Sequence, residues 1–302
     1  MKIGVSTLYF WELPIEYILD IFNDIGIKNI EFFPENPEFW ENRFNLEYIS
    51  NLKSEFKKYS VALHCPHIEL NPSSLNPYVK EATIKETLWS IELAKFYKCN
   101  LITIHPGKRP TNRPPRKEEY NAFYRYVNKS LKEATEKNVM LCLENLPLKV
   151  NNIGQTPEDM KNILEKYNIS NNMDNTDNNN SNNNNNNNNN SNNNNNNNKL
   201  DNLYMTLDFA HSNEYIKEFL EKTIKYIKHT HISGIINNKD HYPITKSQIN
   251  FKEHINKLLD YGYKGMFNLE IDDKKLGLKE NELTVNNKIS AILKEIEYLE
   301  NI

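Results

Sequence analysis

Cysteine and glycine are both scarce in this sequence, which has three cysteines and eight glycines among 302 residues. Cys65, Cys99 and Cys142 are too few and too widely spaced for a disulfide framework or a cysteine-rich zinc site. This low cysteine content favours a reducing compartment, so we expect a cytoplasmic protein. The scarcity of glycine also leaves the first predicted turn, residues 6–10, without the glycine-rich pattern of a dinucleotide-binding fold.

Long hydrophobic runs and a strong charge imbalance are lacking as well. No apolar stretch approaches the roughly 20 residues that a membrane-spanning helix needs, so we expect no membrane partner. Residues 1–6 have the pattern of a folded strand and not that of a signal peptide. Lysine and arginine number 37 against 40 aspartates and glutamates, which gives a formal charge of −3. This balance excludes a strongly cationic nucleic-acid-binding protein but is compatible with a local basic groove.

A run that is almost entirely asparagine occupies residues 171–198. The run has almost no apolar side chains to bury, so it cannot offset the entropy that ordering it would cost. We therefore expect a disordered insertion and interpret it as a tolerated expansion of a surface loop; an aggregation-prone or partner-binding tract is the alternative. The rest of the chain is close in length to one (β/α)8 barrel, for which about 250 residues are typical.

Short β-branched segments alternate with amphipathic segments of helical period along the remaining chain. The predicted strands are Ile3–Ser6, Asn29–Phe33, Val61–Pro66, Leu101–Pro106, Val139–Asn145, Leu203–Phe209, Ile227–Ser233 and Met266–Ile271. The predicted helices include Pro14–Gly26, Leu46–Tyr59, Pro77–Tyr97, Lys117–Asn138, Glu214–Tyr226, Phe251–Gly262 and Glu280–Leu299, and a further helix is expected between the fifth strand and the asparagine run. Eight such units predict one α/β domain over residues 1–302, a (β/α)8 TIM barrel; an open doubly wound sheet usually has fewer strands. The asparagine run precedes the sixth strand, at the face of the barrel away from the chemistry.

Carboxylates and histidines stand at the carboxyl ends of the predicted strands, where barrel enzymes carry their functional groups. From the second strand to the eighth, these residues are Glu31, His64, His105, Glu144, Asp208, His231 and Glu270, with His211 and His241 in the loops that follow the sixth and seventh strands. Converging carboxylates and imidazoles repel or desolvate one another unless a cation lies among them. A divalent metal resolves this conflict, and a ligand set without thiolate suits zinc, manganese, iron or cobalt.

The remaining histidines have less specific surroundings. His229 is on the same strand face as His231 but one layer deeper, so we expect it in the core or behind the ligands. His67 follows the third strand and is expected to line the mouth of the barrel. His254 falls on a predicted helix and is expected to be solvated.

The order and spacing of these groups resemble the xylose isomerase-like TIM barrels, which include sugar isomerases, sugar epimerases and endonuclease IV (AP endonuclease family 2). The resemblance covers nearly the whole chain apart from the asparagine run. Its anchors are His64, His105-Pro106-Gly107, Glu144-Asn145, Asp208-Phe209-Ala210-His211, His231, His241-Tyr242-Pro243 and Glu270. Each motif alone is weakly specific, whereas their order and spacing together are strongly specific.

The resemblance implies a set of metal ligands. One divalent ion, zinc or manganese, would be held by the residues that match the epimerase branch: Glu144, Asp208, His231 and Glu270. His64 and His105 match ligands of a second zinc in endonuclease IV, where Glu144 would bridge the two ions. His211 and His241 match ligands of a third zinc.

One departure from the family affects the third zinc. The family carries an aspartate two residues before the last histidine, and this chain has Lys239 at that position. Asp240 is adjacent to His241, but neighbouring side chains on an extended segment point in opposite directions. The departure therefore argues against a complete third site. Gly234 also stands where family members often carry aspartate or asparagine.

The isomerase branch implies proton transfer on an open-chain sugar or sugar phosphate. The metal would act as a Lewis acid, while Glu144 and Glu270 would remove and return the proton through an enediolate. His211 is expected to bind a substrate hydroxyl, and Glu31 is a candidate for the same role. The aromatic residues 9–11 would form either an apolar wall against the sugar or packing at the barrel rim.

The nuclease branch implies zinc ions that generate hydroxide and clamp a DNA phosphate. DNA would also need a cationic track, for which the best candidates lie in one proline-rich loop: Lys108, Arg109, Arg113, Arg116 and Lys117. Through Lys108 and Arg109, the same loop would serve a phosphorylated sugar; a plain solvated loop is the other alternative. His64 and His105 favour the nuclease branch, whereas Lys239 and the balanced charge favour the isomerase branch, which is our interpretation.

Overall fold

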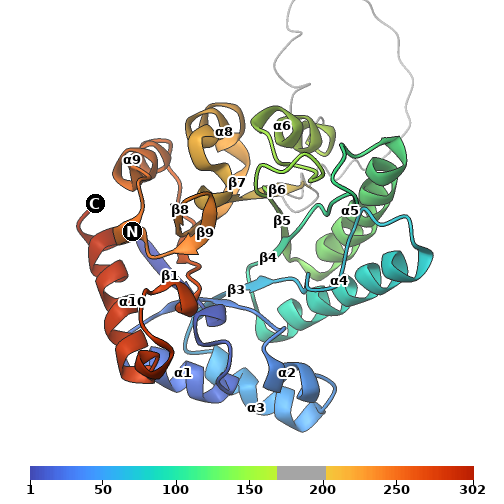
Figure 1. Ribbon diagram of the computed structural model, residues 1–302. Coiled ribbons are helices and arrows are strands. Elements are labelled where there is room, and N and C mark those ends of the chain that lie inside the picture. The colour runs from blue at the N-terminus through green and yellow to red at the C-terminus, as the bar shows by residue number, and fades with distance from the viewer. Residues whose placement is uncertain (169–201) are drawn as a thin grey trace, which may run out of the picture.

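The computed structural model describes residues 1–168 and 202–302. Eight parallel strands close into a barrel in the order β1-β10-β7-β6-β5-β4-β3-β2, and helices surround them (Figure 1). The barrel strands are β1 (Lys2–Ser6), β2 (Asn29–Phe32), β3 (Ser60–His64), β4 (Leu101–Ile104), β5 (Met140–Glu144), β6 (Tyr204–Asp208), β7 (Ile227–Ile232) and β10 (Met266–Leu269). The predicted TIM barrel is thus confirmed. The asparagine run at 171–198, with its predicted disorder, lies outside the described residues.

The helices follow the strands in the expected alternation. They are α1 (Ile15–Asp24), α2 (Pro37–Asn42), α3 (Leu46–Phe56), α4 (Pro77–Tyr97), α5 (Lys117–Lys137), α6 (Pro157–Lys166), α7 (Phe209–Ser212), α8 (Ile216–Thr223), α9 (Phe251–Asp260) and α10 (Val285–Glu300). A hairpin of β8 (Gly234–Ile236) and β9 (Lys239–Tyr242) stands apart from the barrel sheet. This hairpin, α2 and α7 were not predicted, α6 is the helix expected before the asparagine run, and the last helix begins at Val285 and not at residue 280.

Local sequence signals explain where several helices begin and end. The side chains of Asn45 and Asn76 accept hydrogen bonds from backbone amides in the first turns of α3 and α4. At the other end of α4, Lys98 adopts φ 61°, and Asn138 adopts φ 57° after α5. This left-handed conformation stops the helical hydrogen-bond pattern and turns the chain towards the next strand.

Helix α1 illustrates how the outer helices attach to the barrel. Ile15, Ile18, Leu19 and Phe22 recur at helical spacing, and all four are buried. Burying each such side chain contributes roughly 1.5–3 kcal/mol, so one apolar face is enough to hold the helix against the strands. Within the described residues, no helix combines the length and the apolar character needed to cross a membrane.

The inside of the barrel contains polar side chains below its carboxyl-terminal end. Thr103 Oγ1 lies 2.9 Å from Thr206 Oγ1, and Asn268 Nδ2 donates to Glu31 Oε2 at 2.7 Å. Because all eight strands are parallel, their carboxyl ends meet at one end of the barrel, directly above these groups. The ends of α6 and β6 meet at the opposite end, where Asn168 Nδ2 donates to Leu203 O at 2.9 Å.

Candidate metal centre

Glu144 lies at the centre of the side chains that converge on the mouth of the barrel. It ends β5 and is 1% exposed. Its Oε1 lies 3.2 Å from Nδ1 of both His211 and His231. Its Oε2 lies 3.3 Å from His64 Nε2 and 3.0 Å from His105 Nε2. One buried carboxylate therefore contacts imidazoles from two different sides.

A first candidate cation site combines the four residues that the resemblance implied. Glu144, Asp208, His231 and Glu270 each offer a ligand atom, and these atoms all lie within 4.8 Å of one another. His231 Nδ1 is 2.9 Å from Glu270 Oε2 and 3.9 Å from Asp208 Oδ2. The pKa of Asp208 is raised to about 6, because burial and the carboxylates of Glu144 and Glu270 together outweigh the lowering effect of His211 and His241.

The donor atoms of this cluster fit a divalent cation. Asp208 Oδ2, His231 Nδ1 and Glu270 Oε2 are buried and close to one another, but none of them makes a hydrogen bond of normal geometry. A buried polar atom without a partner costs free energy that a bound cation would recover. Three carboxylates and one imidazole form a donor set that suits zinc or manganese.

The ring of His231 is oriented from behind by Glu31. His231 Nε2 lies 3.0 Å from Glu31 Oε2, which leaves Nδ1 for the cation. Glu31 also lies 3.2 Å from His229 Nε2, as the deeper position predicted for His229 suggests. Burial raises the pKa of Glu31, but His231 and His229 outweigh it and hold this pKa well below its usual value. Glu31 is fully buried and does not line the pocket, so its position favours contact with His231 over the predicted contact with a substrate.

Asp240 joins His211 and His241 in another cluster, contrary to the sequence-based expectation. The three side chains offer ligand atoms within 4.8 Å of one another, with His211 Nε2 at 3.6 Å from Asp240 Oδ2. The strand pairing explains the error. Gly234 pairs with Tyr242 and Ile236 with Lys239, so β9 holds one extra residue, and His241 adopts φ 54°. Such a bulge breaks the alternation of side chains and turns neighbouring residues towards one side. Lys239 itself is exposed.

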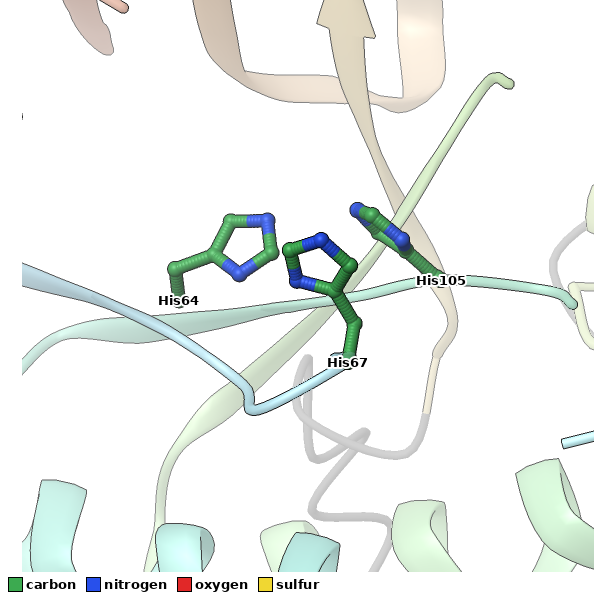
Figure 2. Close-up of side chains that lie close together, drawn as sticks. All are labelled: His64, His67 and His105. Carbon is green, nitrogen blue, oxygen red and sulfur yellow. The ribbon is translucent and has the colours of Figure 1, made fainter. Parts of the chain in front are cut away.

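His64 and His105 face each other on the opposite side of Glu144. Their ring centroids are 5.0 Å apart, and Figure 2 shows both rings together with that of His67. His64 is buried at the end of β3, and His105 follows β4. As expected, His67 lines the mouth of the barrel.

A pocket of about 330 Å³ opens above these groups. Its apolar wall consists of Leu8, Trp11, Phe33 and Ile68, and its metal-type ligands are His64, His105, Glu144, His211, His241 and Glu270. Trp11 packs against Phe33 with ring centroids 5.6 Å apart. Of the aromatic residues at positions 9–11, only Trp11 lines this pocket, because Tyr9 and Phe10 are fully buried in the core. Phe33 and Ile68 were not predicted, since an apolar residue after a strand gives no signal of its own.

The proline-rich loop after β4 does not contribute cations to this pocket. Arg109 Nε lies 3.6 Å from Glu119 Oε1, and its guanidinium also donates to Pro114 O. Lys108 lines a separate pocket of about 230 Å³, which shares His67 and His105 with the first. The expected contacts of Lys108 and Arg109 with a substrate above the metal ligands are therefore not supported.

Comparison with known proteins agrees with this architecture. The family model described as the xylose isomerase-like TIM barrel matches residues 19–174 and 195–302. The uncharacterized protein MJ1188 of Methanocaldococcus jannaschii is 57% identical over 302 residues, which span 100% of this chain and 99% of that protein. The probable endonuclease 4 of Thermosipho africanus is 29% identical over 157 residues, which are 47% of this chain and 51% of that protein.

Solved structures share the fold over the whole chain. A D-psicose 3-epimerase from Clostridium cellulolyticum H10, solved with D-tagatose, superposes with a TM-score of 0.74 at 16% identity and covers 100% of this chain and 99% of its own. The IOLI protein, solved with a zinc atom, gives a TM-score of 0.69 at 13% identity, with 99% of each chain covered. At these identities the similarity establishes the barrel fold only.

Proposed function

The chain belongs to the xylose isomerase-like TIM barrel family, and from this membership we propose that it is a divalent-metal-dependent isomerase or epimerase of a small sugar or sugar phosphate. The observation that carries the proposal is a pocket of about 330 Å³ with apolar walls, which is lined by Glu144 and Glu270 of the four-residue metal-type cluster. This volume suits a small polar molecule, and the aromatic wall suits the carbon face of a sugar. D-psicose 3-epimerase shows that this fold accommodates a ketose, although the similarity itself extends to the fold alone.

Glu144, Asp208, His231 and Glu270 would hold the cation, zinc or manganese, as the partnerless buried atoms of this cluster suggest. When bound, the cation supplies positive charge that orients and polarises a carbonyl and its neighbouring hydroxyl. Glu31 holds the ring of His231 so that Nδ1 stays on the side of the pocket.

Glu144 and Glu270 carry the proton transfer in this proposal. Both line the pocket, where one carboxylate removes the proton next to the substrate carbonyl and the other returns it. The substrate passes through an enediolate between these two steps. His211 donates a hydrogen bond to a substrate hydroxyl, while Trp11 and Phe33 cover the carbon face and exclude water.

Metal-dependent cleavage of DNA at abasic sites is the second candidate function. Asp240 lies with His211 and His241, and His64 faces His105, so the ligands for more than one cation are present. The partial similarity to probable endonuclease 4 supports this candidate. Against it, Lys274 is the one lysine or arginine among the described residues that line the pocket, whereas DNA phosphates require a cationic track.

Proton exchange with solvent tests the first candidate even though the substrate has not been identified. The metal-loaded full chain is incubated in D2O with a panel of ketoses, aldoses and their phosphates, and NMR follows deuterium at the carbon next to the carbonyl. We expect exchange with at least one member and no exchange after chelation. No exchange across the panel, combined with incision of an abasic-site duplex, would reverse the order of the two candidates.

A further inference from the structure

His67 lies outside the machinery described so far but packs against two of its histidines. Its ring centroid is 4.3 Å from that of His105 and 5.3 Å from that of His64. The three side chains offer nitrogen atoms that lie within 4.8 Å of one another, and Figure 2 shows nitrogen atoms of all three rings turned towards a common space. The rings come from β3, from the loop after β3 and from the loop after β4.

Glu35 fixes the position of His67. Its carboxylate accepts backbone hydrogen bonds from His67 N at 2.9 Å and from Ile68 N at 2.8 Å. The same Oε2 lies 3.4 Å from His67 Nδ1, a buried atom without another partner. Nε2 is therefore the nitrogen of His67 that remains for the common space. A carboxylate behind an imidazole is the usual second layer of a metal site.

His64 is held in the same way. Its Nδ1 lies 2.9 Å from Cys65 O and donates to this carbonyl, so Nε2 is the nitrogen that remains for a cation. Nε2 is also the atom that faces His105, since both Nε2 atoms lie within 3.3 Å of Glu144 Oε2. At least two of the three rings thus have Nδ1 beside an oxygen acceptor and Nε2 towards the others.

We propose that His67 is the third imidazole ligand of a second cation site, formed by His64, His67 and His105, and that Glu35 is the positioning residue of His67. Three imidazoles without a thiolate suit zinc or cobalt, and the fourth position faces Glu144 Oε2. This site lies on the opposite side of Glu144 from Asp208, His231 and Glu270, and its three imidazoles do not belong to that cluster. The proposal rests on the proposed function only in that the first cation site belongs to that function. His64, His67 and His105 themselves take no part in the proton transfer.

Anomalous diffraction from crystals of the full chain grown with cobalt chloride tests the ligand set directly. We expect a peak within about 2.0–2.2 Å of Nε2 of His67 as well as of His64 and His105. A peak beside His64 and His105 that leaves His67 beyond ligand distance would overturn the proposal, as would no peak among the three rings.

Cobalt titration of the metal-stripped full chain gives an independent measurement in solution. We expect His67→Ala to bind one equivalent fewer than the wild type, and Glu35→Gln to bind that equivalent about 10–100-fold more weakly. His254→Ala, which removes a histidine from α9, is the matched control and should bind as the wild type does. Equal stoichiometry and affinity in His67→Ala would contradict the proposal.

The Glu270→Gln variant separates this proposal from the proposed function. It should lose a cobalt equivalent from the first site while it keeps the one that depends on His67. Loss of that equivalent in His67→Ala, together with failure of every sugar in the exchange assay, would leave the second site standing and reject the isomerase. Sugar turnover with unchanged cobalt binding in His67→Ala would support the isomerase and reject the second cation site.

Discussion

Each carboxylate oxygen of Glu144 contacts a different pair of histidines, so this single side chain couples two regions of the mouth. Oε1 faces His211 and His231, and Oε2 faces His64 and His105. Burial raises the pKa of Glu144, but His231 and His105 outweigh it and hold this pKa well below its usual value. An anion is therefore maintained in a buried place, as a ligand of cations requires.

Replacement of Glu270 by glutamine tests the role of the second candidate glutamate. Glutamine keeps the shape but neither accepts a proton nor carries charge, so we expect turnover to fall by roughly 10²–10⁴-fold. The same loss is expected for Glu144→Gln. Steady-state kinetics on the sugar identified by the exchange assay measures the effect, and circular dichroism checks the fold. The exposed Glu280→Gln is the control. Full activity in both site variants would show that the acid–base roles are misassigned.

Glu35 gives a pH dependence of stability that can be measured without metal. Burial raises its pKa from 4.5 to about 7. Between these two pH values, Glu35 therefore keeps its proton in the folded protein but has released it in the unfolded chain. The contribution of protonated Glu35 to the free energy of unfolding is fully present below pH 4.5 and is lost as the pH rises to about 7.

Urea unfolding of the chelated protein and of Glu35→Gln, from pH 5 to pH 8, checks this dependence. Glutamine does not titrate, so the difference in unfolding free energy between wild type and variant should decline up to about pH 7 and then stay constant. A difference that does not change with pH would contradict the raised pKa.

At the scale of elements, the β8–β9 hairpin decides which side chains reach His211. Asn237 and Asn238 form its turn with φ 51° and 58°, a conformation that asparagine tolerates better than most residues. The extra residue in β9 then turns Asp240 and His241 towards the same cluster. The sequence rule of alternating side chains failed here because the rule holds only for a regular strand.

Gly234 is the position at which this hairpin is most sensitive to substitution. A Cβ atom there would lie 2.5 Å from Pro243 O, a backbone atom that cannot move alone. We expect Gly234→Ala to lower the free energy of unfolding by about 1–3 kcal/mol, because the hairpin must shift. Urea unfolding measures the change. Lys239→Ala on the exposed face of the same hairpin should stay within about 0.5 kcal/mol of wild type, and equal effects of both would refute the close-approach argument.

At the scale of the whole molecule, the pocket and the described residues nearest the asparagine run lie at opposite ends of the barrel. The flanking residues meet at the end of the barrel opposite the pocket, where Asn168 bonds to Leu203 O. Deletion of residues 171–198 should therefore leave the unfolding midpoint nearly unchanged and turnover within a few-fold of wild type, since a short linker joins neighbouring ends at little cost. Thermal melts and sugar turnover of the shortened chain check this. A large loss of activity would mean that the run contacts the site.

The sequence by itself determined the barrel and most of the candidate ligands at its mouth. Eight alternating strand and helix segments are a one-dimensional pattern, and parallel strands bring their carboxyl ends together in any closed barrel. The convergence of His64, Glu144, Asp208 and Glu270 follows from that topology, so their order along the chain was sufficient to predict it.

Only the tertiary structure decided what each polar group faces. Glu31 lies behind His231, Asp240 lies beside His211, and Glu35 lies behind His67. These relations depend on depth within the barrel, on a bulge in one strand and on the path of a loop. No spacing in the chain encodes such features, because they result from the packing of segments that are distant in sequence.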